Sequence, residues 1–558
     1  MKLFKDKYKT IIILLVIWFV ATAFNITKAV HIDDTAYLWI AENILANPLH
    51  PMSGMLNWEG EARPIYKTLN PIATSYIFAA TISLFGESEI ALHLVFSLFI
   101  LAAIVFFYLL AKHFVASWRY LLTAMFILGP SVLPSQNLMS DIPALSLWLA
   151  FFWLLLCPTS EKDRAKRYIF AALTCGFAIL IKYSSFFLLP ILIVDIILRK
   201  KWRYIFVLAI PVFIVIGWSI FNFLDYGKIH LLSSQNTAFD LYAISKRFSL
   251  WLVTLGAVAP FSLIFIPKLI SSKKGGLLII ACLAAAELSS FKNWEFANEP
   301  QVSYFLRKLF FANGLLVLSL VIGIIFKKLY DFRSRHPLFT NPVNVPYLIL
   351  FLWFLGGSVL VIIFVPFIAV RHLIGVVPAI LLILGLNINI HPQINKRSLY
   401  AGFCLTVGMG MLLALSDWVY ADVYRVSAPI IMTQVRKLQK QAKADSTVWF
   451  GGHWGWQWYA QKVGMRQYDS WNSILESGDY LVMPLVERQW WIKPENWAYL
   501  VPVDKLTVVS TPATFVRIMT NWPFSPAGFY AVGEPQHLPW TILNSPLEEF
   551  TIYEFKKT

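Results

Sequence analysis

Two adjacent carboxylates, Asp33 and Asp34, follow the first long apolar stretch of the chain, residues 11–23. They lie in the polar segment His31-Ile32-Asp33-Asp34-Thr35-Ala36-Tyr37. Charge at a membrane surface is costly unless it is solvated, paired or used in chemistry. Two interpretations follow. The pair ends a helix at the lipid headgroups, or one carboxylate is a proton acceptor or metal ligand at the mouth of a membrane-embedded cavity.

Positively charged side chains stand at the ends of two later apolar segments. Lys182 follows residues 168–181, and Arg371 and His372 begin the segment 371–390. A guanidinium group can bind a phosphate through two parallel hydrogen bonds, so Arg371 is a candidate anion-binding residue. Lys182 and Arg371 are also compatible with side chains that only reach along a helix to the membrane interface.

The composition indicates a protein with many transmembrane helices. The chain has 558 residues, of which 58% are hydrophobic and 14% charged, whereas a soluble domain has about 25% charged residues. Apolar runs of about 20 residues, long enough to cross a bilayer, recur along the chain. The net charge of +16 comes from short basic clusters between these runs, which favours an effect on membrane orientation over nucleic-acid binding.

The apolar runs predict about thirteen transmembrane helices, with the N-terminus in the cytoplasm and the C-terminus outside. The first covers residues 10–29 and is followed by a long external loop, 30–87. In this loop, residues 37–46 have helical spacing, and residues 71–85 are expected to form a juxtamembrane or re-entrant helix. The other spans are expected near 88–111, 120–136, 141–157, 168–181, 184–198, 204–222, 249–267, 276–290, 308–326, 346–366, 371–390 and 399–419.

The chain changes character after residue 420. Residues 421–558 are more polar and contain no run long enough to cross a membrane. Strand-like runs at 447–451 and 480–484 alternate with a helix-like piece at 455–463, a pattern typical of a small α/β domain. The sequence therefore predicts a transmembrane module over 1–420 and a small extracytoplasmic α/β domain over 421–558.

Several motifs occur in a recognisable order. They are Asp33–Tyr37, Asn70–Ile72 with Phe85–Glu89, Leu138–Pro143, Arg371–Leu373 with Pro378, and Gly455–Ala460. In their order and spacing they resemble the polytopic glycosyltransferases of the GT-C superfamily, especially the family 39, protein-mannosyltransferase-like and aminoarabinose-transferase-like members. The resemblance covers most of the chain and implies the GT-C fold. It also implies an enzyme of the bacterial inner membrane.

The resemblance implies that a sugar is transferred, with inversion, from a polyprenyl-phosphate carrier to a lipid, glycan or protein acceptor on the external face. Asp33 is the expected base, and Asp34 is a candidate either to orient it or to hold a metal. Asp141 is a third catalytic candidate, although an Asp before Pro143 also suits a helix cap. The candidates for binding the donor phosphate are Lys182, Arg371, His372 and Lys67. The tryptophans of the C-terminal domain fit stacking on sugars, but packing or interfacial roles are favoured.

A divalent metal is the least supported part of this expectation, and no cofactor is certain. Some relatives hold a metal with a carboxylate before a Pro-Pro motif and a later histidine, but this chain has Leu69 and Asn70 at the corresponding place. The candidate ligands are Asp33, Asp141 and His230. A lone histidine such as His230 is more often a hydrogen-bonded surface residue.

Two other classes of protein remain as alternatives. A lipid or sugar transporter or flippase would place charged or broken helices at mid-bilayer, often in repeated halves. Only Asp195 and Glu287 look like deep carboxylates, and both lie near the end of a span. A non-catalytic scaffold would not need polar residues gathered on one face, so an enzyme is favoured over both alternatives.

Overall fold

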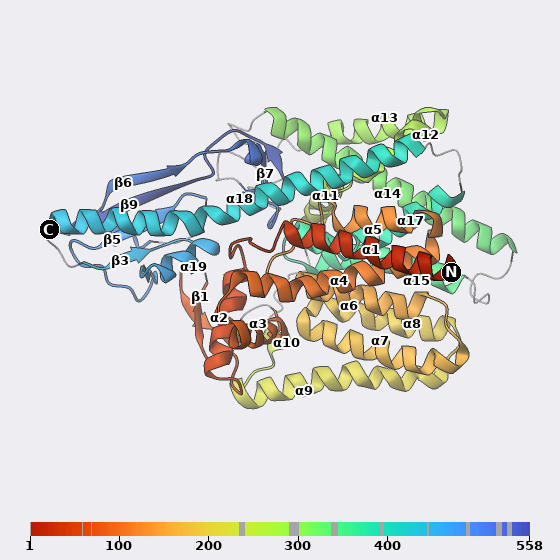
Figure 1. The fold of residues 1–558 in the computed structure, drawn as a ribbon, viewed down its shortest axis with the longest axis horizontal. Helices are drawn as coiled ribbons and strands as arrows, with labels where there is room; N and C mark the ends of the chain where they lie inside the picture. The colour runs from red at the N-terminus through yellow and green to blue at the C-terminus, as the bar shows by residue number, and fades with distance from the viewer. Residues whose placement is uncertain are drawn as a thin grey trace.

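The computed structural model describes residues 2–58, 60–67, 70–233, 240–289, 301–335, 344–390, 396–442, 446–486, 492–519, 527–532 and 538–557. Most of the helices form one bundle, and a β-sheet lies beyond one end of it (Figure 1). The N-terminus lies at the opposite end of the bundle from the sheet. The long helix α18 (Lys396–Ala442) runs from the bundle to the sheet and joins the two parts.

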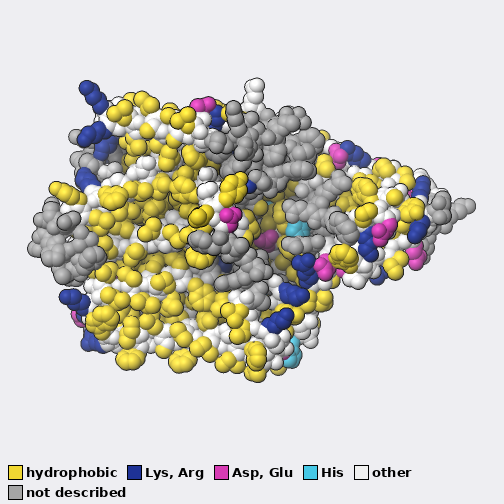
Figure 2. All heavy atoms as spheres, turned by 180° about the vertical axis from the view of Figure 1, so that it is seen from behind, with side chains coloured by type: hydrophobic (Ala, Val, Ile, Leu, Met, Phe, Trp, Pro, Cys, Tyr) yellow, Lys and Arg dark blue, Asp and Glu magenta, His cyan; other side chains and the backbone are white. Residues whose placement is uncertain are grey.

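Within the described ranges, five helices are long and apolar enough to cross a membrane: Glu89–Phe114, Trp202–Tyr226, Gln301–Phe332, Val345–Phe364 and Lys396–Gln441. Backbone polar groups find no water in a bilayer, and a helix satisfies them internally. Hydrophobic side chains cover most of the helical part of the face seen in Figure 2, with Lys and Arg at both sides of this band. The chain is an integral membrane protein, and the count of about thirteen spans stays a prediction.

The main helices of the bundle and its loops have the following bounds. They are α1 (Lys2–Ala23), α2 (Asp34–Ala46), α3 (Ala73–Phe85), α4 (Glu89–Phe114), α5 (Arg119–Ile127), α6 (Asp141–Leu156), α7 (Glu161–Ile181), α8 (Leu188–Leu198), α9 (Ala209–Tyr226), α10 (His230–Ser233), α11 (Leu241–Val258), α12 (Ile266–Ile270), α13 (Lys273–Leu288), α14 (Gln301–Arg335), α15 (Val345–Val359), α16 (Val370–Leu373) and α17 (Val377–Ile390).

Small residues allow two of these helices to cross at close range. A Cβ atom added to Gly256 of α11 would lie 1.8 Å from the carbonyl oxygen of Phe310 on α14. A Cβ added to Gly314 of α14 would lie 2.0 Å from the carbonyl oxygen of Leu252 on α11. Such contacts between backbones are typical of packing inside membranes, where dispersion and close approach hold helices together.

Two expected spans differ from the observed helices in ways that matter for the site. The span expected over 120–136 ends as a helix at Ile127, and residues 128–140 continue as buried irregular chain. Pro130 and Pro134 explain this end, because proline cannot donate a helical hydrogen bond. The span expected over 371–390 is divided into α16 and α17, so Arg371 lies on its own short helix.

The sheet beyond the bundle is built from the C-terminal part of the chain. Its strand order is β4-β3-β5-β9-β6. Strand β3 (Val448–Phe450) is parallel to β4 (Arg466–Gln467) and β5 (Tyr480–Pro484), whereas β9 (Glu548–Phe555) is antiparallel to β5 and β6 (Leu500–Val508). Helix α19 (Gly455–Lys462) connects β3 to β4. Helix α18 passes without a break through the domain boundary expected at residue 420.

Most of the tryptophans considered for sugar binding are packed inside this part of the chain. Trp449, Trp456 and Trp458 are buried, whereas the side chain of Trp471 is 59% exposed. Trp454 is partly exposed. Trp449, Trp456 and Trp458 therefore pack inside the protein, whereas Trp454 keeps part of its side chain exposed.

The arrangement predicts which residues face each side of the membrane. Single cysteines at Ser53 and Ser477, which are exposed near the sheet end of the bundle, should react with an impermeant thiol reagent added outside cells. A cysteine at Ser117, exposed between α4 and α5, should react only after permeabilisation, because the adjacent basic cluster favours the cytoplasm. External labelling at Ser117 would contradict the orientation. Cys404, the exposed native cysteine, is replaced by serine in all variants.

Candidate functional site

A strained turn between α1 and α2 presents Asp33. Ile32 has a φ of 51°, a left-handed conformation that is costly for a β-branched residue. The carboxylate of Asp34 supports this turn, because its Oδ2 atom accepts the backbone N–H of His31 at 3.1 Å. Asp34 is fully buried. The structure thus gives Asp34 a positioning contact within the turn.

Asp33 belongs to a cluster of acidic and basic side chains, here called the carboxylate–cation cluster: Asp33, Asp141, Lys182, Arg371 and the neighbouring His372. Arg371 Nη1 donates to Asp33 Oδ2 at 2.6 Å, and Lys182 Nζ donates to Asp141 Oδ1 at 2.5 Å. Lys182, Arg371 and His372 all act electrostatically on Asp141. The side chain of Asp33 is 28% exposed, so the cluster is open to solvent at this carboxylate.

Four separate elements contribute to this cluster. Asp33 precedes α2, Asp141 begins α6, Lys182 follows the last residue of α7, and Arg371 lies on α16. Tyr37 links the first two elements, because its hydroxyl lies 2.9 Å from Ser140 Oγ and accepts a hydrogen bond from Asn70 at 3.2 Å. All four elements meet at one end of the bundle, which is where a reaction at a membrane surface would be carried out.

Two alternatives considered for single residues do not hold. Helix α6 begins at Asp141 itself, and its N-cap Ser140 makes no side-chain cap hydrogen bond. Asp141 is therefore an ion-pair partner and not a cap for a helix entered at Pro143. Lys182 contacts Asp141 and so does more than reach to the interface.

Lys67 is not brought into the cluster. It is the last residue of the short 3-10 helix η1 (Ile65–Lys67), and its side chain is exposed. In the part of the chain that the structure describes, Lys67 takes no part in the ion pairs of Asp33 and Asp141. Its assignment to the donor phosphate stays a prediction without a supporting contact.

The three candidate metal ligands do not form one ligand set. Asp33 and Asp141 are each paired with a cation, and the ring of His230 lies 2.7 Å from the Tyr183 hydroxyl, which accepts a hydrogen bond from Trp218. Among the described residues, no three His, Cys, Asp or Glu side chains are grouped so that they could hold a metal. His230 is a buried hydrogen-bonded residue, and a divalent metal stays a prediction.

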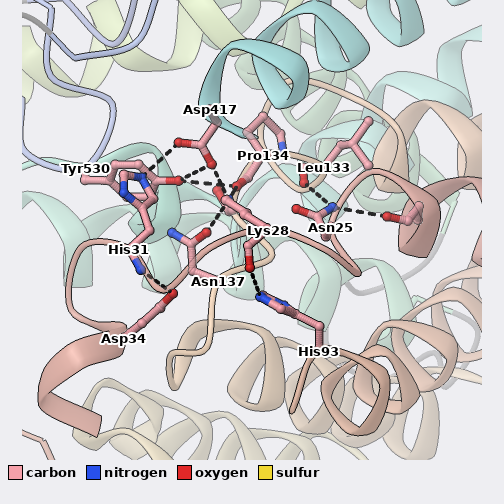
Figure 3. A network of polar contacts seen from close by, with 12 residues as sticks. Asn25, Lys28, His31, Asp34, His93, Leu133, Pro134, Asn137, Asp417 and Tyr530 are labelled. Atoms are coloured by element: carbon pink, nitrogen blue, oxygen red, sulfur yellow. Dashed lines mark hydrogen bonds and ion pairs between the residues drawn. The ribbon is translucent and has the colours of Figure 1, made fainter. Parts of the chain in front are cut away.

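A second set of polar residues lies behind the turn (Figure 3). Asp417 of α18 accepts a hydrogen bond from the Tyr530 hydroxyl at 2.7 Å, lies 3.1 Å from His31 Nε2, and forms an ion pair with Lys28. Lys28 also donates to Asn137 and to the carbonyl of Pro134. Lys28, His31 and Asp417 are almost completely buried. This buried network holds the 31–34 turn against α18 and the 128–140 segment.

Sequence reasoning missed the buried network. Lys28 and Asp417 each lie close to the end of an expected span, where a charge is equally typical of the membrane interface. An ionisable residue inside a transmembrane segment is a sign of a paired or functional group. Asp417, which follows sixteen residues without a charge from Ala401 to Ser416, carried this signal.

The carboxylate–cation cluster offers two chemical capabilities. The partly exposed carboxylate of Asp33 can accept a proton from a bound hydroxyl group. Arg371 and Lys182 can bind an anion by charge-assisted hydrogen bonds. Because both cations are paired with carboxylates in this structure, an incoming anion would compete with Asp33 and Asp141 for them.

Residues 70–221 match the family model described as dolichyl-phosphate-mannose-protein mannosyltransferase. This match confirms, over those residues, the resemblance drawn from the motifs. None of the curated proteins compared with the chain matches it.

The solved structures that are similar to the chain include the following three. ArnT from Cupriavidus metallidurans in the apo state has 15% sequence identity and a TM-score of 0.42, covering 90% of this chain and 97% of its own. The same protein bound to undecaprenyl phosphate has 16% identity and a TM-score of 0.40, covering 88% and 95%. The oligosaccharyltransferase AglB from Archaeoglobus fulgidus, in complex with an inhibitory peptide and a dolichol-phosphate, has 12% identity and a TM-score of 0.46, covering 86% and 70%.

Proposed function

We propose that this chain is a membrane glycosyltransferase that moves a sugar from a polyprenyl-phosphate carrier to an acceptor on the outer face of a bacterial inner membrane. The observation that carries the proposal is the carboxylate–cation cluster, where Asp33 is paired with Arg371 and Asp141 with Lys182 at one end of the bundle. The family match over residues 70–221 supports the reaction class.

In the proposed reaction, an oxygen of the acceptor forms a bond to the anomeric carbon of the donor sugar. The bond from that carbon to the carrier phosphate breaks, and its electron pair leaves with the phosphate. Asp33 takes the proton of the acceptor hydroxyl. The leaving phosphate needs positive charge and no strong acid, and Arg371 and Lys182 supply that charge. Attack from the side opposite the leaving group inverts the anomeric carbon.

The pairing of Arg371 with Asp33 suggests an order of binding. Before the donor arrives, Arg371 Nη1 occupies Asp33 Oδ2. A bound phosphate would draw the guanidinium toward itself, because phosphate accepts two hydrogen bonds from one arginine. The carboxylate oxygen would then be available to the acceptor's proton. On this mechanism the donor binds first and prepares the base for the acceptor.

The proposal is tested with the purified protein in liposomes. The donors are radiolabelled polyprenyl-phosphate sugars, and the acceptors come from cell-envelope lipid, glycan and protein fractions. The parent protein is expected to move label into one acceptor fraction and to release the carrier phosphate. If intact labelled donor crosses the bilayer and no label enters an acceptor, the protein is a flippase and the proposal is wrong.

Replacing Arg371 by alanine is expected to raise the KM for the lipid donor and to lower kcat. The donor phosphate is anionic before reaction and gains charge as the glycosidic bond breaks, so both states lose a charge-assisted contact worth about 1.5–3 kcal/mol. Arg371→Lys should recover part of the loss, since an ammonium keeps the charge without the two-pronged geometry.

Arg63→Ala serves as the control for Arg371, because Arg63 is an exposed arginine of the long loop that forms an ion pair with Glu61 at 2.9 Å. Titrating the lipid donor against each purified variant measures KM and kcat separately. If Arg371→Ala binds a polyprenyl phosphate as tightly as the parent, Arg371 is a structural partner of Asp33, and Lys182 becomes the residue to test.

A further inference from the structure

A loop of the C-terminal part of the chain reaches Asp33. The N-terminal end of α19 packs so closely on the 30–31 segment that a Cβ added to Gly455 would lie 2.6 Å from the Val30 carbonyl oxygen. Tyr459 of α19 accepts the backbone N–H of Val30 at 2.8 Å. The hydroxyl of Thr35 donates to the carbonyl oxygen of Trp454 at 2.9 Å. Helix α19 and the residue that precedes it therefore contact the chain both before Asp33, at Val30, and after it, at Thr35.

Three aromatic rings gather at this contact. The rings of Trp58 and His453 have centroids 4.3 Å apart, and those of His453 and Trp454 are 5.1 Å apart. Trp58 lies between the strands β1 (Met55–Asn57) and β2 (Ala62–Pro64) of the long loop, whereas the other two precede α19. Trp58 and Trp454 are partly exposed, and His453 is buried beneath them. The three rings are here called the aromatic platform.

The backbone at the aromatic platform is strained. Trp454 has a φ of 57° and a ψ of −130°, and a non-glycine residue in this region costs about 1–3 kcal/mol. Strain of this kind persists only where the surrounding contacts over-determine the conformation. Burial of a tryptophan does not account for it, because Trp454 keeps part of its side chain exposed.

Asp33 is the charged group that bears on the histidine of the platform. The carboxylate of Asp33 acts electrostatically on His453, whereas Lys182, Arg371 and Asp141 act on His372. Burial lowers the pKa of His453 to about 4, and Asp33 only partly opposes this. The imidazole is thus neutral near pH 7 and adds no charge to the platform. Through Thr35 the platform adjoins Asp33, whose carboxylate is also paired with Arg371.

We propose that the aromatic platform of Trp58, His453 and Trp454 binds a sugar ring of the acceptor, so that the acceptor of this enzyme is a carbohydrate. The faces of aromatic rings are electronegative and attract the C–H groups of a sugar. In an inverting transfer the attacking hydroxyl lies on the side opposite the leaving phosphate, so the acceptor has to be held beside the base, and the platform adjoins Asp33 through Thr35. This inference rests on the proposed function, because it assigns the acceptor's proton to Asp33.

The test measures binding of simple sugars to the full-length protein in lipid nanodiscs. The probes are a panel of methyl hexosides and methyl pentosides, with a serine- and threonine-containing peptide as the alternative acceptor class, and binding is followed by saturation-transfer NMR. Trp454→Gly removes the ring and suits the positive φ, whereas Trp454→Phe keeps an aromatic face. Trp471→Ala removes an exposed tryptophan of the same part of the chain and is the control.

Saturation transfer to the ring protons of at least one glycoside is expected for the parent. Trp454→Gly should weaken this binding about tenfold, while Trp454→Phe and Trp471→Ala bind nearly as the parent does. The proposal is overturned if no glycoside binds, if Trp454→Gly binds like the parent, or if peptide binding is what depends on Trp454.

A second measurement separates this inference from the proposed function. Binding of a polyprenyl phosphate should be equal in the parent, Trp454→Gly and Trp454→Phe, because the platform does not contact the phosphate. Parent protein that binds glycosides through Trp454 but binds no polyprenyl phosphate would refute the donor assignment while supporting the sugar site. Thermal unfolding of each variant establishes that the glycine variant is folded.

Discussion

Replacing Asp33 by asparagine is expected to slow sugar transfer by about 10²–10⁴-fold, the usual loss when a general base is removed. Asparagine keeps the size of the side chain, and its amide oxygen can still accept a hydrogen bond from Arg371, but it cannot take a proton. The donor should bind at least as well as before. Arg371 is paired with Asp33 at 2.6 Å, and the neutral amide competes less strongly with phosphate for the guanidinium.

The measurement is kcat with saturating donor, together with direct binding of a polyprenyl phosphate. Glu61→Gln is the matched control, because Glu61 is an exposed carboxylate of the same loop, paired with Arg63 at 2.9 Å, and exposed pairs contribute about 0–1 kcal/mol. Retained activity in Asp33→Asn with loss of activity in Asp141→Asn would assign the base to Asp141. Weaker donor binding by Asp33→Asn would argue against the proposed competition for Arg371.

The elements that position the site were accessible from sequence where a pattern was local. The helical spacing of residues 37–46 lies within α2, and the strand-like runs 447–451 and 480–484 contain β3 and β5. The charges at Asp33, Asp141, Lys182 and Arg371 stand next to apolar runs, so their common location at one end of the bundle followed from membrane topology. Their proposed roles stay predictions.

What could not be predicted depends on contacts between distant residues. The difference between Asp33 and Asp34 arises from the left-handed turn at Ile32, which turns one carboxylate to Arg371 and the other to the His31 backbone. Nothing in two adjacent aspartates distinguishes them. Likewise, the aromatic platform joins Trp58 to His453 across almost 400 residues of sequence, a pairing that only the docking of the sheet on the long loop creates.

The buried network shows how a single distant carboxylate controls the turn. Asp417 has no exposed side-chain surface and contacts Lys28, His31 and Tyr530. The bond to His31 fixes the first residue of the turn, and Asp34 fixes the same residue through its backbone. Asp417 is thus expected to stabilise the fold and also to keep Asp33 directed at the site, although it does not reach the site itself.

Replacing Asp417 by asparagine is therefore expected to destabilise the protein by about 3–5 kcal/mol, because a buried ammonium group loses its counter-charge. Glu87→Gln is the control, since Glu87 pairs with Lys462 at 2.9 Å where both side chains are exposed by 40% or more, and such pairs contribute little. Thermal unfolding in detergent should show a much lower midpoint for Asp417→Asn and an unchanged midpoint for Glu87→Gln.

At a temperature where Asp417→Asn is still folded, kcat should also fall while donor binding is unchanged, because the turn no longer holds Asp33 in place. An unchanged midpoint would mean that Asn137 and the Pro134 carbonyl suffice to hold Lys28, and that the ion pair with Asp417 is dispensable.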